Sequence, residues 1–117
     1  VHAQDIDLFH TTAQVKITEN SSFSFSDTSS DLLFNKDLER MNFTEITANM
    51  HLGLVNQDSI MPVRAIDELG KDVTDNFFTI DNKQLKIKRK TMPAMLTLDE
   101  RVIRQDCLCY LMERIKL

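Results

Sequence analysis

The chain has 117 residues, 42% of them hydrophobic, which is enough for one domain with a single modest core. Its formal charge of -4, from 18 acidic and 14 basic residues, provides no basic field for nucleic acid. No apolar run reaches the ~18 residues that a membrane-spanning helix needs. We therefore expect residues 1–117 to form one small domain.

The first residues resemble the end of an export signal. Val1 and Ala3 are small residues followed by Gln4, as before a signal-peptidase cut. The alternative is that Val1 begins the region just outside a membrane anchor. Both interpretations predict the soluble part of a longer chain, located in the periplasm and held at the inner membrane or exported.

Alternating residues predict two strands in the first third of the chain. The first covers residues 9–18, and a shorter one follows at Phe23 and Phe25 with serines on its outer face. Residues 31–41 fit either a helical stripe or a strand at 32–34 followed by a turn. We favour the strand and turn, because hairpins on either side favour a meander.

The clearest strand pattern has apolar residues alternating with polar or small ones: Ile46, Ala48, Met50, Leu52 and Leu54. A period of two places all five on one face of a strand, whereas a helix would split them. We expect the other strands to pair with this one. If the sheet curled into a barrel, a lipophilic cavity would be lined by the four larger side chains, Ile46, Met50, Leu52 and Leu54. Ordinary core is the simpler interpretation.

The alternation of Met61, Val63 and Ala65 predicts the next strand. Pro62 cannot donate to a ladder, so this strand is expected to start or lie at a sheet edge. We predict that this edge accepts a strand from a protein partner, with the C-terminal segment as the alternative edge.

A hairpin is predicted over residues 78–87, with a four-residue loop at 81–84. Here lies the one basic cluster of the sequence: Lys83, Lys86, Lys88, Arg89 and Lys90. Such a cluster keeps a hairpin soluble and blunts an edge, or it contacts acidic headgroups or an acidic partner. It lacks the interleaved aromatic residues that single-stranded nucleic acid requires.

The C-terminal segment fits both a helix and a strand. Thr97 and Glu100 match a capping box, which predicts one short helix near residues 97–106. We favour a strand at 107–117. It would close the sheet that contains the alternating strand at 46–54, which we take as the central strand. The expected fold is therefore mainly β, with α+β as the alternative, in an antiparallel curved sheet or barrel.

No motif predicts catalysis, a metal or a cofactor. Cys107 and Cys109 have a C-x-C spacing that fits neither a C-x-x-C redox motif nor a zinc site, so buried thiols are expected, with a strained or intermolecular disulfide as the alternative. His10 and His51 lie on the polar faces of two predicted strands. If these strands paired, the two histidines would form a surface that responds between about pH 5 and 8; solvated histidines are the simpler interpretation.

Four patterns follow one another along the chain: Phe9-His10 in a strand, a serine and phenylalanine strand, a long alternating strand at 43–55, and Asn76-Phe77-Phe78-Thr79-Ile80 leading into Leu85-Lys86-Ile87. This order resembles the small periplasmic accessory proteins of ToxR-like membrane transcription regulators, the ToxS, FidL and PsaF type. The resemblance implies a non-enzymatic, membrane-anchored domain with a curved antiparallel sheet or small barrel. It also implies that the domain binds and stabilises the regulator in response to pH, temperature or lipids.

Two other functions fit the same patterns. A secreted pilin or adhesin subunit would donate residues 5–18 to a neighbouring subunit. A small cytosolic factor would contain Cys107 and Cys109 as ordinary reduced thiols.

Overall fold

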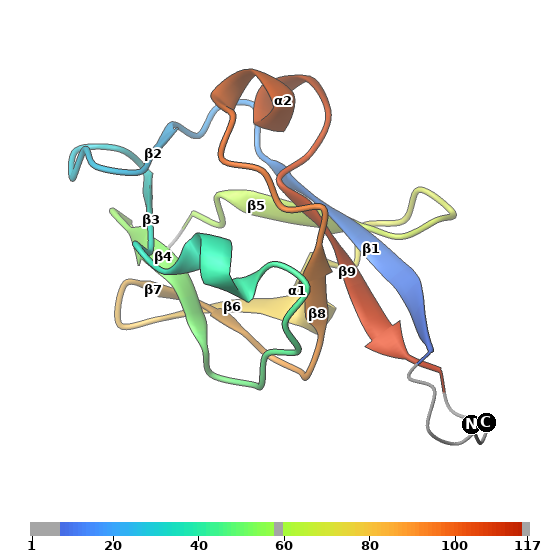
Figure 1. The fold of residues 1–117 in the computed structure, drawn as a ribbon. Coiled ribbons are helices and arrows are strands. Elements are labelled where there is room, and N and C mark those ends of the chain that lie inside the picture. Colours follow the sequence, from blue (N-terminus) through green and yellow to red (C-terminus); the bar gives the residue numbers. More distant parts are fainter. Residues whose placement is uncertain (1–7, 58–59, 116–117) are drawn as a thin grey trace.

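The computed structural model describes residues 8–57 and 60–115, which form nine strands, two short α-helices and a 3-10 helix (Figure 1). In chain order these are β1 (Phe9–Ile17), β2 (Phe23–Ser24), β3 (Leu32–Phe34), η2 (Leu38–Met41), β4 (His51–Val55), β5 (Val63–Ile66), α1 (Thr74–Phe77), β6 (Phe78–Asp81), β7 (Gln84–Ile87), β8 (Met92–Ala94), α2 (Glu100–Gln105) and β9 (Cys109–Arg114). The predicted mainly β fold is confirmed. Within these two ranges, no helix has the length and apolar character needed to cross a bilayer.

The strands form two sheets where the sequence pattern suggested one. The four-stranded sheet has the order β5-β1-β9-β8, and the five-stranded sheet has the order β2-β3-β4-β7-β6. All pairs are antiparallel except β2 with β3. Strand β4 is the middle of its sheet, as expected for a central strand. The C-terminal strand was predicted to close the sheet of this central strand, and that prediction is wrong: β9 lies in the other sheet, between β1 and β8.

One core lies between the two sheets. Val15 and Leu111 enter it from the four-stranded sheet, and Leu32 and Leu85 enter it from the five-stranded sheet, all at most 1% exposed. The alternation predicted for the first strand holds in its second half, where the inward-facing residues are buried. A register shift between β1 and β9 interrupts it near Thr11.

A corner breaks the long strand that was predicted from Ile46 to Leu54. Ile46 exchanges two backbone hydrogen bonds with Thr91, next to the start of β8, whereas β4 begins only at His51 and pairs with β7. Asn49, between them, has a φ of 77°, in the left-handed region that asparagine tolerates better than most residues. The same stretch therefore contributes to both sheets, as strands do at the corners of packed sheets.

This corner also separates the residues that were predicted to share one face, including the four proposed to line a cavity. Ile46 and Leu52 are each 2% exposed in the core, while Met50 and Leu54 are 38% and 46% exposed. A second irregularity, a register shift between His51 and Gly53, contributes to the split. The prediction of one apolar face, and of a lipophilic cavity lined by all four, is wrong.

Strands β3 and β4 approach each other closely at Gly53. A Cβ atom added at Gly53 would clash with the carbonyl oxygen of Leu33. Glycine is therefore required here by the distance between two backbones, in a strand whose remaining residues all carry side chains.

The hairpin and the C-terminal helix differ from prediction in detail. The β6–β7 loop has two residues, Asn82 and Lys83, both with positive φ as in a type I′ turn, so the predicted four-residue loop is wrong. The helix begins at Glu100, and its N-cap is Asp99, which accepts from the amide of Arg101 at 2.9 Å. The predicted cap, Thr97, lies too early in the chain and accepts from the amide of Asp99.

The described residues confirm the strand that was favoured near the C-terminus, as β9. They also confirm the strand at 32–34, although η2 follows its turn. The predicted processing site at residues 1–4, residues 5–7 of the donated segment, and residues 116–117 lie outside the described residues.

Candidate functional site at the edge of strand β5

Strand β5 lies at an edge of the four-stranded sheet, where Pro62 predicted an edge strand. Its inner side pairs with β1 from Gln14 opposite Ile66 to Ile17 opposite Val63. The opposite edge of this sheet, β8, is covered by the backbone of residues 43–46. Strand β9 lies between two strands, so the alternative edge at the C-terminus is not formed within residues 8–115.

Residues 72–74 of the same chain cover half of the β5 edge. The amide of Val73 donates to the carbonyl of Ala65 at 2.8 Å, and the amide of Ala65 donates to Oγ1 of Thr74 at 2.9 Å. Ile66 and Asp72 form an isolated bridge beside them. Residues 72–74 therefore occupy the position of a neighbouring strand as far as Ala65.

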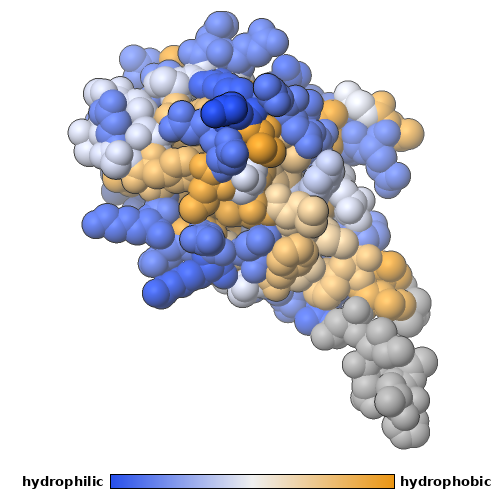
Figure 2. Space-filling model, turned by 45° about the horizontal axis from the view of Figure 1, so that its top comes forward, coloured by the Kyte–Doolittle hydropathy of each residue, from blue (hydrophilic) through white to orange (hydrophobic). Residues whose placement is uncertain are grey.

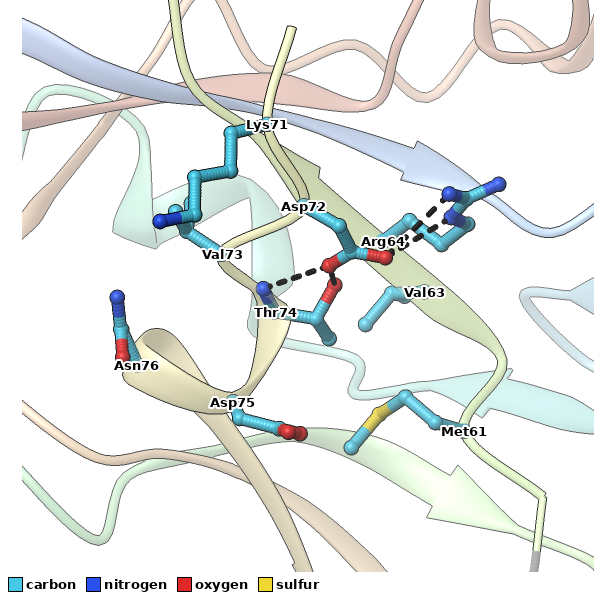
Figure 3. A pocket seen from close by; sticks show the side chains of 9 residues that line it. All are labelled: Met61, Val63, Arg64, Lys71, Asp72, Val73, Thr74, Asp75 and Asn76. Atoms are coloured by element: carbon cyan, nitrogen blue, oxygen red, sulfur yellow. Dashed lines mark hydrogen bonds and ion pairs between the residues drawn. The ribbon is translucent and has the colours of Figure 1, made fainter.

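The other half of the edge has no covering strand among the described residues, although Val63 itself is only 1% exposed. Thr74 begins α1, and the chain turns away from β5 at that point. In an antiparallel pair, the backbone groups of alternate residues point to opposite sides. Ala65 bonds outward, so Val63, two residues earlier, also points its amide and carbonyl away from β1. A cavity of about 530 Å³ lies there, lined by Met61 and by residues of β5, of 71–73 and of α1 (Figure 3).

Asp72 organises the wall of this cavity (Figure 3). Its Oδ1 accepts from the hydroxyl of Thr74 at 2.5 Å and from the amide of Thr74 at 2.9 Å, and its Oδ2 lies 3.3 Å from two nitrogens of Arg64. The hydrogen bonds from Thr74, with a smaller contribution from Arg64, hold the pKa of Asp72 below its ordinary value of 3.8. The ionised carboxylate in turn orients the Thr74 hydroxyl so that its oxygen accepts from Ala65.

Replacing Thr74 with valine is expected to lower the free energy of unfolding by about 2 kcal/mol, because the buried amide of Ala65 loses its acceptor. Urea denaturation followed by circular dichroism measures the change. Thr74→Ser keeps the hydroxyl and should lose much less. Equal losses in the two variants would show that the hydroxyl does not stabilise this edge.

The lowered pKa of Asp72 also predicts a pH dependence of stability. A carboxyl whose pKa is lower in the folded state stabilises the fold above its unfolded pKa, and this contribution is lost as pH falls through the folded pKa. Below about pH 3.8, we expect the urea concentration at the unfolding midpoint to decrease more steeply with falling pH in the wild type than in Asp72→Asn. Parallel pH profiles for the two proteins would contradict this.

The two histidines proposed for pH sensing lie in different sheets. His10 is on β1 and exposed, whereas His51 is on β4 and half-buried, and these strands do not pair. Nε2 of His51 lies 3.4 Å from the side-chain nitrogen of Asn35, while its Nδ1 is buried without a hydrogen-bond partner among the described residues. The paired surface that the sequence suggested is therefore not formed.

Cys107 and Cys109 are buried free thiols; Cys107 lies just before β9 and Cys109 begins it. Burial raises the pKa of both thiols, which disfavours the reactive thiolate.

The sequence pattern did not predict that residues 72–74 would seal the edge. The polar residues and Gly70 at 67–75 indicate only a loop or a single helical turn. The one local signal, Asp72 two residues before Thr74, is typical of a turn or helix cap, and it does not identify β5 as the partner.

Among the described residues, no group of three His, Cys, Asp or Glu side chains is arranged to hold a metal ion. The chain matches no family model, and comparison with curated proteins and with solved structures gives no significant match.

Proposed function

We propose that the domain is a non-enzymatic regulatory partner that binds an extended segment of a membrane-anchored, ToxR-like transcription regulator in the periplasm. The half of the β5 edge that residues 72–74 leave uncovered carries this proposal, because the alternation along β5 directs the amide and carbonyl of Val63 toward a cavity. Val63 is only 1% exposed, so binding requires the wall of this cavity to move aside. The class of the partner and its location come from the sequence resemblance.

A partner strand placed against Val63 would continue the line that residues 72–74 occupy beside Ala65. A strand advances about 3.3 Å per residue, so the stretch from Met61 to Val63 accommodates about three partner residues. Backbone bonds would supply affinity, and the cavity walls would select the side chains of the partner. A contact this short belongs to the weak, reversible class of interfaces.

The position of β1 favours a regulatory partner over a pilin-type subunit. A donated segment at residues 5–18 would leave its own domain, whereas β1 lies between β5 and β9 of the same chain. Its residue Val15 is fully buried there.

Site-specific photo-crosslinking in cells tests the proposal. A photoreactive residue at position 61 should crosslink to the periplasmic part of a membrane-anchored regulator, and Met61→Lys should weaken that complex by placing a charge on the edge. The control position is Leu69, a 91% exposed residue on a neighbouring loop. Equal crosslinking from positions 61 and 69, or recovery of the tagged full-length product in the cytosol, would reject the proposal.

A further inference from the structure

The segment that follows β5 lies along the edge to which a partner strand would bind. Residues 67–71 form a loop that projects from the body of the domain, on the right of Figure 1 and of Figure 2. Residues 72–74 then run back beside β5 as far as Ala65. We call residues 67–74 the strap. The strap occupies part of the edge that a partner strand needs.

Among the described residues, a small number of contacts hold the strap to β5. The amide of Val73 donates to the carbonyl of Ala65, and the amide of Ala65 donates to the hydroxyl of Thr74 in place of a backbone carbonyl. The ion pair between Arg64 and Asp72 joins side chains that are 55% and 48% exposed, and exposed pairs of this kind add little stability. The strap is therefore attached much less firmly than a strand inside the sheet.

The buried surface of the strap is concentrated in its last two residues. Residues 68–72 are exposed, and Leu69 is 91% exposed. Val73 is half-buried against the core, Thr74 is 7% exposed, and the chain is anchored again at Phe77, which is 4% exposed. Segments with few buried apolar contacts open locally without unfolding of the whole domain. The strap has this property, between two well-packed ends.

The outer edge of β5 is longer than the half that the strap leaves uncovered. The amide of Thr18 donates to the carbonyl of Pro62 on the β1 side, whereas Ala65 bonds to the strap on the other side. Because backbone groups alternate along a strand, Arg64 faces β1, and Val63 and Ala65 both face the outer edge. With the strap in place, a partner can use Val63 alone. With the strap displaced, it can use both residues.

We propose that the strap is a displaceable cover, and that the partner strand takes the place of residues 72–74 along the whole outer edge of β5. This inference rests on the proposed function and specifies how the partner binds. A backbone carbonyl of the partner would accept from Ala65 in place of the Thr74 hydroxyl, and an aliphatic side chain would replace that of Val73. At about 3.3 Å per residue, the edge over residues 61–66 accommodates about six partner residues instead of about three.

Displacement of the strap also opens the way to Val63. This residue is 1% exposed, and the wall of its cavity includes residues 71–73 of the strap. Moving the strap away from β5 removes that part of the wall, so one movement uncovers both outward-facing residues. Because the strap and the partner compete for Ala65, the apparent affinity for the partner is reduced by the fraction of molecules in which the strap is closed. The strap is thus an autoinhibitory contact.

Native-state hydrogen exchange of the 117-residue chain tests whether the strap opens by itself. The amides of Ala65 and Arg64 are matched, because they are neighbours in one strand and point to opposite sides of it. We expect the amides of Ala65 and Val73 to exchange on the order of tenfold faster than that of Arg64, with little dependence on low concentrations of urea. Equal rates for Ala65 and Arg64 would show that the strap opens only with the whole domain, and would overturn the proposal.

A disulfide that locks the strap tests its displacement by the partner. Ile66 and Asp72 form an antiparallel bridge without hydrogen bonds to each other, and the Cα atoms of such a pair lie about 4.5 Å apart, within reach of a disulfide. Once oxidised, Ile66→Cys with Asp72→Cys should lose the crosslink from position 61 to the regulator, and reduction should restore it. Peptide mapping distinguishes the new bridge from the buried thiols of Cys107 and Cys109.

The control is Ile66→Ser with Asp72→Ser, which changes the same two positions without linking them and should still crosslink. Crosslinking of the oxidised cysteine variant at the level of this control would overturn the displacement of the strap, while the proposed function would stand. Absence of the crosslink in the wild type would instead reject the proposed function. The exchange rates would still show whether the strap opens, so the two failures are distinguishable.

Discussion

Replacing Gly53 with alanine is expected to destabilise the protein by about 3 kcal/mol, because the new methyl group has no space between β3 and β4. The atom that it would meet is the carbonyl oxygen of Leu33, which belongs to a backbone and cannot rotate away. The two strands would have to separate in the middle of the five-stranded sheet. Urea denaturation followed by circular dichroism measures the change.

Gly70 provides the matched control, since a Cβ there would meet nothing within 4 Å. Its φ of 80° still makes alanine unfavourable, so Gly70→Ala should cost only about 1 kcal/mol. A loss at Gly53 no larger than the loss at Gly70 would show that β3 and β4 lie farther apart than described.

Replacing Leu108 with alanine is expected to lower the free energy of unfolding by about 3 kcal/mol, through lost burial and the cavity that remains. Leu108 is fully buried just before β9, where its amide donates to Val15 and its carbonyl accepts from Thr97. Both backbone contacts survive the substitution, so the change isolates the side chain. Thermal unfolding should show the loss as a fall in Tm.

The same substitution at Leu69, which is 91% exposed, should change stability by less than about 0.5 kcal/mol. The pair compares one chemical change in two environments. A similar loss at both positions would contradict the burial of the segment that leads into β9.

Local patterns predicted the strands well where the chain stays in one sheet. Strand β1 was expected at residues 9–18 and runs from Phe9 to Ile17. The hairpin of β6 and β7 was expected from alternation alone. Its apolar residues Phe78, Leu85 and Ile87 are buried, and Ile80 is half-buried. These features depend on neighbours in the sequence, so the sequence alone predicts them.

The division into two sheets could not be predicted in the same way. A period of two shows which residues alternate, but it does not show where a strand bends out of its sheet. The bend at Asn49 moves Ile46 into contact with Thr91 and leaves Met50 on the surface. The assumed pairing of the strands of His10 and His51 failed for the same reason, since it depended on contacts distant in sequence.

The candidate site was predictable only in part. Pro62 identified an edge strand, because its missing amide restricts where it occurs in a sheet. The covered part of this edge depends on Thr74, whose hydroxyl replaces a backbone acceptor for Ala65. A side chain that takes the place of the backbone acceptor of a neighbouring strand follows no periodic pattern of residues. The sequence pattern therefore does not reveal it.

The pairing of β1 with β9 has a consequence for how the protein is made. The hydroxyl of Thr12 donates to the carbonyl of Leu111, 99 positions later in the chain. During synthesis, one side of β1 therefore has no native partner until residues 109–114 have left the ribosome. An unpaired strand of this length is an aggregation hazard, and pairing across such a separation is slow. Completion of the four-stranded sheet is thus a late event, and until then one edge of β1 is exposed to aggregation.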